Sequence, residues 1–116
     1  MARPHEKLDA WQQAMHLVRQ INEMTSRFPP EERFGLTSQM RRAAVSIPSN
    51  IAEGAARETR REFAHFVSTA RGSLSELETQ ALIAAGLGYI DRSDDVFTAL
   101  ERVSQLVSGL HRSLKD

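Results

Sequence analysis

Apolar residues recur every three or four positions along this chain, which predicts four amphipathic helices. The helices span about residues 8–27, 36–56, 60–85 and 93–114. No segment alternates between apolar and polar residues as a half-buried strand does. Because the connections are short, consecutive helices should lie antiparallel, and the pattern predicts an all-α, up-down-up-down four-helix bundle. The large apolar residues expected to face the core from the first helix are Leu8, Trp11, Met15, Val18, Ile21 and Met24.

Residues that cap or stop helices separate these segments. Residues 28–30, Phe-Pro-Pro, end the first helix because two prolines cannot continue it. Thr59 and Glu62 have the spacing of a capping box at the start of the third helix. Residues 86–88, Gly-Leu-Gly, end that helix, and residues 91–94 offer an N-cap for the fourth.

The second helix has apolar or small residues on two opposite sides. Its predicted core stripe comprises Leu36, Met40, Ala43, Ile47 and Ile51. Roughly opposite lie Val45, Ala52 and Ala56. Pro48 removes one helical hydrogen bond and predicts a kink, with Ser49 and Asn50 close enough to help satisfy the group it frees.

The third helix also has a second face, made of small residues. Opposite its core stripe lie Ser68, Gly72, Ser75 and Thr79. A solvated helix face normally carries Lys, Glu and Arg, so we interpret these faces of the second and third helices as a subunit interface. The alternative is that helical propensity and chance place small residues on an ordinary surface.

A polar stripe runs between the two faces of the second helix and meets polar residues of the third. The residues of this predicted network are Arg42, Ser46, Asn50, Glu53 and Glu76. Arg42 is expected to pair with Glu76 or Glu53. Because burying charges is costly, such a network would fix the register of the helices more than it would add stability.

Composition bounds the class of protein. The 116 residues fit one domain, with residues 1–7 as a flexible lead and residues 8–116 as the bundle. The chain has no cysteine, and its 15 basic and 15 acidic residues cancel. No apolar run approaches the 20 or so residues of a membrane span, and no signal peptide is recognisable, so we expect a cytoplasmic protein without a membrane partner.

Enzymatic motifs are lacking in this sequence. It contains no phosphate-binding P-loop, nucleophile elbow or zinc-protease motif. Glu62 and His65 form one Glu-x-x-His pair, whereas di-iron bundles need two such pairs and two further glutamates. We therefore predict a protein that is not an enzyme, with no catalytic residue, cofactor or metal, and keep a small metal-dependent enzyme as the least favoured alternative.

Arginines gather around the connection between the second and third helices. The predicted nucleic-acid-binding residues are Arg57, Arg60, Arg61 and Arg71. Guanidinium groups suit phosphate, and an oligomer would repeat the cluster. The competing interpretation is a solvated helix end of mixed charge, since Glu58 and Glu62 lie among the arginines.

Several motifs together resemble a known family. They are Phe28-Pro29, Gly35-Leu36, residues 39–44 (QMRRAA), residues 46–54 (SIPSNIAEG), Glu62-Phe63, residues 72–79 (GSLSELET) and residues 87–89 (LGY). In these motifs the chain is similar to the four-helix bundle proteins also called 23S rRNA intervening sequence proteins. The resemblance implies a left-handed antiparallel bundle that assembles as a homopentamer with a central pore.

A related bundle is the accessory variability protein of diversity-generating retroelements, which is basic and binds nucleic acid. The zero net charge of this chain departs from that relative. The sequence thus predicts a non-enzymatic, oligomeric binding or scaffold protein whose favoured partner is nucleic acid, either RNA or DNA, with structured RNA as the leading candidate. The alternative is an adaptor that binds another protein and has no nucleic-acid role.

Overall fold

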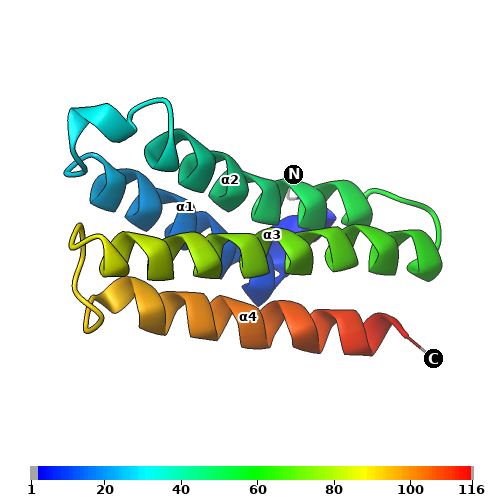
Figure 1. The fold of residues 1–116 in the computed structure, drawn as a ribbon. Coiled ribbons are helices and arrows are strands. Elements are labelled where there is room, and N and C mark those ends of the chain that lie inside the picture. The colour runs from blue at the N-terminus through cyan, green and yellow to red at the C-terminus, as the bar shows by residue number, and fades with distance from the viewer. Residues whose placement is uncertain (1–2, 116) are drawn as a thin grey trace.

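The structure, a computed structural model, describes residues 3–115 and contains four α-helices. Helix α1 spans Asp9–Thr25, α2 spans Leu36–Ala55, α3 spans Arg60–Gly86 and α4 spans Asp95–Leu114. Consecutive helices run in opposite directions (Figure 1). Each helix packs against two others, in the cyclic order α1, α2, α3, α4. The predicted all-α, up-down-up-down bundle is confirmed, while its left-handed sense stays a prediction.

The core is a column of aliphatic side chains enclosed by the four helices. All five residues of the stripe predicted for α2 are buried. Helix α3 contributes Ala70, Leu74, Leu77, Ala81 and Ala84 to this core, and α4 contributes Val96, Leu100, Val103 and Val107. Removing this much apolar surface from water is the main favourable term in folding the bundle.

Helix α1 faces the core with a different stripe from the one predicted. Its buried residues include Ala10, Ala14, Leu17, Ile21 and Met24, so only Ile21 and Met24 of the predicted six are buried. The other four, Leu8, Trp11, Met15 and Val18, are half-buried along the flank of the helix. Small alanines on the core side let α1 approach its neighbours closely, and the larger residues cover the edge of the core.

The connections at one end of the bundle are tied together by Glu32. This residue ends the short 3₁₀ helix η2, Pro30–Glu32, between α1 and α2. One carboxylate oxygen accepts a hydrogen bond from the backbone N–H of Leu36, at 3.1 Å, and so caps α2. The other oxygen accepts a hydrogen bond from the Tyr89 hydroxyl, at 2.9 Å. Tyr89 lies in the connection between α3 and α4.

The connection between α2 and α3 is tight because Gly54 lies against α3. A Cβ atom at this position would stand 2.8 Å from Phe63 Cδ1 and 2.8 Å from Phe66 Cβ. Thr59 then caps α3, accepting from the backbone N–H of Glu62 at 3.1 Å. In a capping box the Glu62 carboxylate would accept a hydrogen bond from the Thr59 backbone N–H. Here it accepts instead from the Thr59 hydroxyl, at 3.0 Å.

Two further predictions are corrected near the chain ends and inside α2. Pro4–Lys7 form the 3₁₀ helix η1, which packs on α1 and α2, so the predicted flexible lead is structured over these residues. Met1, Ala2 and Asp116 lie outside the described residues. Pro48 is buried inside α2, where the predicted kink stays a prediction. The Asn50 side chain donates to the Ser46 carbonyl and not to the Ala44 carbonyl, which the Pro48 nitrogen cannot serve.

Candidate functional site

The arginines predicted to bind nucleic acid divide into two groups. Arg57 is held at the end of α2, where its guanidinium pairs with Glu53 at 3.0 Å and lies 4.8 Å from the ring centroid of Phe66. Its charge is therefore partly offset. Arg60, Arg61 and Arg71 all lie on α3, on the side that faces α4 or close to it.

Arg60 and Arg71 each contact the last turns of α4. Arg60 donates from Nη2 to the backbone carbonyl of Ser113, one of the carbonyls that a helix end leaves without an intrahelical partner. Arg71 Nη1 lies 3.2 Å from Nδ1 of His111. The Arg61 side chain makes no hydrogen bond or ion pair with any other residue of the range 3–115, and it is exposed.

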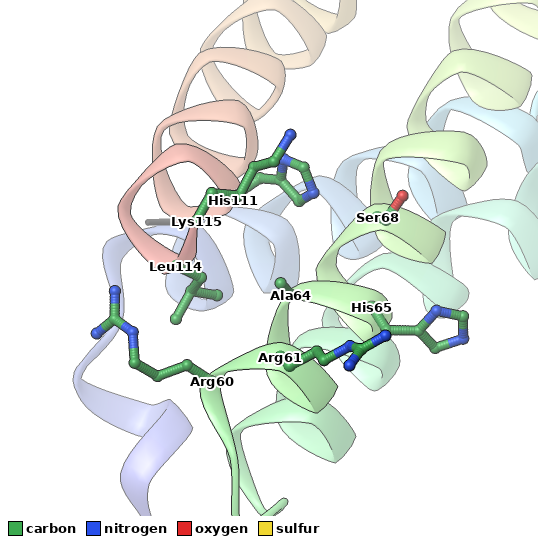
Figure 2. Close-up of a pocket in the computed structure, with 8 residues that line it drawn as sticks. All are labelled: Arg60, Arg61, Ala64, His65, Ser68, His111, Leu114 and Lys115. Atoms are coloured by element: carbon green, nitrogen blue, oxygen red, sulfur yellow. The ribbon is translucent and has the colours of Figure 1, made fainter.

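Arg60 and Arg61, but not Arg71, line an open cavity of about 640 Å³ between the start of α3 and the end of α4. Its cationic or imidazole-bearing residues come from both helices: Arg60, Arg61, His65, His111 and Lys115. Ala64 and Leu114 add an apolar part, and Figure 2 shows them between the two helix ends. None of the described residues that line the cavity is acidic, so the permanently charged side chains of this lining are all positive although the chain is neutral overall.

The imidazole of His111 lies close to positively charged side chains. Burial lowers the pKa of its imidazole, and the charges of Arg71 and Lys115 lower it further. A guanidinium can only donate, so Nδ1 of His111 must accept from Arg71 and the ring proton must be on Nε2. His111 is therefore a neutral side chain at pH 7 with one N–H group to offer a ligand.

His65, His111 and Lys115 were not among the predicted binding residues. The available signal was topological, because an up-down-up-down bundle brings the end of its fourth helix beside the start of its third. Basic residues in the last turns of α4 would then have joined the arginines of α3.

The polar stripe is partly formed. The Ser46 and Ser73 hydroxyls hydrogen-bond across the α2–α3 interface at 2.7 Å, and the Asn50 amide donates to the Ser46 hydroxyl at 3.0 Å. The predicted pairing of Arg42 is wrong, since no ion pair of this residue occurs within residues 3–115. Glu53 pairs with Arg57 one turn away on its own chain segment.

Glu76, the other predicted partner of Arg42, instead accepts a hydrogen bond from the amide of Gln80 on its own helix, at 3.1 Å. Arg42 and Glu76 line a cavity of about 340 Å³ with Ser46 and Ser73. In this stripe α2 and α3 are thus linked by a pair of neutral hydroxyl groups and not by the predicted charge pair.

The sequence of this bundle matches a known protein family. Residues 6–110 match the family described as 23S rRNA-intervening sequence protein, a span that covers all of α1 to α3 and most of α4. The chain belongs to the 23S rRNA-intervening sequence protein family. No curated protein matches it.

Within this member of the 23S rRNA-intervening sequence protein family, the matched segment contains Arg57, Arg60, Arg61 and Arg71. The α4 part of the cavity, from His111 onward, lies just beyond it. The family membership identifies the fold, and the cavity is a feature of this chain's own geometry.

The second face of α3 is exposed over its whole length. Ser68, Gly72, Ser75 and Thr79 are all exposed, and a Cβ atom on Gly72 would meet nothing within 4 Å. No contact inside the protomer therefore requires these residues to be small. Val45 and Ala56, at the end of α2, are exposed and Ala52 is half-buried, whereas Pro48, which we also predict as part of this interface, is buried.

The α2 face forms one wall of an apolar groove. Val45, Pro48 and Ala52 line it from α2, and Trp11 and Met15 line it from α1, around a cavity of about 310 Å³. Val45 is a β-branched apolar residue that is 47% exposed at this groove. The half-buried residues of α1 and the second face of α2 are thus parts of one surface.

The Glu62 and His65 pair does not gather further ligands. Glu62 is occupied by the N-cap hydrogen bond with Thr59, and residues 3–115 contain no cluster of three His, Asp or Glu side chains suited to a metal ion. In the same residues, none of the helices combines the length and apolar character that crossing a bilayer requires.

Proposed function

We propose that this protein is a non-enzymatic, self-associating scaffold that binds nucleic acid, with structured RNA as the ligand. The binding surface is the end of the bundle where α3 begins and α4 ends. The observation that carries this proposal is the open cavity at that end, which Arg60, Arg61 and Lys115 line without an acidic residue among the lining residues of the range 3–115.

Local charge supports the proposal where net charge does not. The chain carries 15 basic and 15 acidic residues, so a long-range positive field is unavailable and phosphate must be bound at short range. Arginine suits this task because its planar guanidinium can donate two parallel hydrogen bonds to one phosphate. Arg57 contributes less than the other arginines, because Glu53 offsets its charge.

Self-association would multiply this surface. The exposed small residues of α3 allow another backbone to approach closely, and the apolar groove between α1 and α2 offers a surface to bury. We propose that these faces meet in a homo-oligomer, a pentamer, in which several copies of the basic cavity lie together. Multivalent attachment to one RNA then raises affinity without new kinds of contact.

RNA binding is tested by fluorescence anisotropy with a labelled RNA hairpin over a series of salt concentrations. Arg61→Glu is the informative variant, because Arg61 makes no hydrogen bond or ion pair within residues 3–115 and its loss should leave the fold intact. Arg102→Glu is the matched control, since Arg102 is exposed on α4 and lines a different cavity, between α1 and α4.

We expect the wild type and the Arg102 variant to bind alike. We expect the Arg61 variant to bind at least about tenfold more weakly. The slope of log K against log salt should also become shallower, by the amount of about one phosphate contact per protomer. Equal weakening by the two variants would show only a loss of total charge and would count against the cavity. No retention of RNA or DNA at low salt would refute the proposed function.

Self-association is tested by sedimentation velocity at several protein concentrations. Gly72→Ala leaves the protomer unstrained, because open space surrounds the new methyl group. If the α3 face is an interface, this variant should dissociate at higher protein concentration than the wild type. A mass of one protomer at every concentration would refute assembly.

The protein-adaptor alternative has one observation in its favour, the apolar groove of Trp11, Met15, Val18, Val45 and Ala52. An amphipathic helix of another protein could fill such a groove with its apolar face. Under this alternative Val45→Glu would abolish capture of such a partner and the wild type would not bind RNA, whereas the first proposal predicts RNA binding that Arg61→Glu weakens.

A further inference from the structure

We propose that the cavity between α3 and α4 binds the phosphorylated end of a nucleic-acid strand, with the terminal phosphomonoester held by Arg60, Arg61 and Lys115. This inference rests on the proposed function and names the part of the ligand that the cavity recognises. It assigns the cavity a preference for chain ends over the interior of a strand.

The shape of the site supports an end and not an interior segment. Proteins that follow the backbone of a strand use extended grooves, whereas this surface is an open cavity of about 640 Å³ that lies between two helix ends. That volume lies within the range of pockets that hold small ligands, about 300–1,000 Å³. A pocket of this kind can receive one terminal nucleotide, while the strand continues outward to solvent.

The charges of the lining match a phosphomonoester better than a phosphodiester. A terminal phosphate carries a charge of about −1.5 to −2 near pH 7, whereas each internal linkage carries about −1. Arg60, Arg61 and Lys115 place three permanent positive charges around the cavity, with no acidic residue among its described lining. Arg60 uses one donor on the Ser113 carbonyl, which anchors the guanidinium and leaves its remaining N–H groups for a ligand.

The rest of the lining suits a sugar and base. Ala64 and Leu114 give an apolar wall, while the exposed imidazole ring of His65 lies at the edge of the cavity and points away from α4 (Figure 2). His111 adds a neutral N–H donor, because its Nδ1 is occupied by Arg71. The site thus combines a cationic part for phosphate with a less polar part for the nucleoside.

The test compares short single-stranded RNAs of one sequence that carry a 5′-phosphate, a 3′-phosphate or no terminal phosphate. Affinities are measured by anisotropy with the full chain at fixed pH and salt. We expect at least one phosphorylated form to bind about tenfold more tightly than the unphosphorylated strand, the effect of roughly one charge-assisted contact. Arg61→Gln should abolish this preference, and Arg102→Gln should preserve it.

Each remaining outcome decides against one specific statement. Equal, salt-dependent binding of the three RNAs would overturn the end preference and leave the proposed function standing. Lack of binding by all three would also overturn the end preference, and the hairpin measurement described above would then decide the proposed function separately. Competition by inorganic phosphate or a free nucleoside monophosphate at the same concentrations as the phosphorylated strand would assign the cavity to free anions and overturn its role in binding a strand. Circular dichroism of both variants checks that helix content is unchanged.

Discussion

Gly54→Ala should destabilise the protein, although alanine is the better helix former. Gly54 is buried in the last turns of α2, where the chain passes beneath the start of α3. The added Cβ would lie 2.8 Å from Phe63 Cδ1, 2.8 Å from Phe66 Cβ and 3.2 Å from the Phe63 carbonyl oxygen. Phe66 Cβ and the carbonyl oxygen belong to a rigid helix, so the clash cannot be relieved by a side-chain rotation alone.

The size of the effect follows from the distances. Carbon atoms in favourable contact are about 3.5–4.0 Å apart, so α2 and α3 must separate locally by roughly 0.7 Å or more. Overpacking of this kind costs about 1–3 kcal/mol. The gain in helix propensity is at most about 1 kcal/mol and is smaller near a helix end. We expect a net loss of about 1–2 kcal/mol and a fall in Tm of roughly 4–10 °C.

Thermal and urea unfolding, followed by circular dichroism at one protein concentration, would measure this loss. Gly109→Ala is the matched control, because the nearest atom to its new Cβ would be Arg112 Nη2, at an ordinary contact distance of 3.8 Å. That variant should be as stable as the wild type or more so. If Gly54→Ala were also as stable as the wild type, the close approach of α2 and α3 would not be what requires glycine here.

Three further predictions concern the caps and the titrating groups. Asp94→Ala should cost about 1 kcal/mol in urea unfolding, because Asp94 accepts from the backbone N–H at the start of α4, at 2.9 Å; Asp95→Ala, which leaves that cap intact, should cost less. The pKa of Glu78 is raised by burial and by Glu101, so its ionised form opposes folding: Glu78→Gln should raise Tm at pH 7 and have little effect near pH 4, where both states are largely protonated. The pKa of His111 is lowered in the folded state, so the unfolded chain binds more protons and stability should fall as the pH drops through about 6.5; His111→Asn should flatten that decline, and an unchanged pH profile would contradict the assignment.

The helices and most of the core could be predicted from sequence because they depend on local periodicity. The stripe from Leu36 to Ile51 is fixed by the 3.6-residue repeat, and Thr59 and Asp94 were recognisable caps from their chemistry and position. The residues of α1 that face the core were harder to predict. Its large residues and its alanines both recur at helical spacing, and the choice of alanines for the core depends on how closely the neighbouring helices approach.

The candidate site depended on tertiary geometry that periodicity does not supply. The arginines of α3 were visible as a cluster, but their partners His111 and Lys115 are separated from them by about forty or more residues along the chain. Polar side chains of α2 and α3 do meet, as predicted, but the contact is between neutral groups and not between Arg42 and Glu76. Gln80, one turn away on α3, binds Glu76 locally, and a local partner is entropically easier to hold than one across an interface.

The two hydrogen bonds of Glu32 make two connections of the bundle behave as one unit. Opening of the segment around Tyr89 releases one carboxylate oxygen, and the freed side chain then holds the Leu36 amide less firmly. The start of α2 and the α3–α4 connection should therefore exchange their amide hydrogens on a shared timescale, as parts of one cooperative unit. The opposite end, where the basic cavity lies, has one covalent connection between helices. Its last α4 turn is held to α3 by Arg60 and Arg71 and not by a chain connection, so opening of that turn need not disturb the two connections that Glu32 ties together.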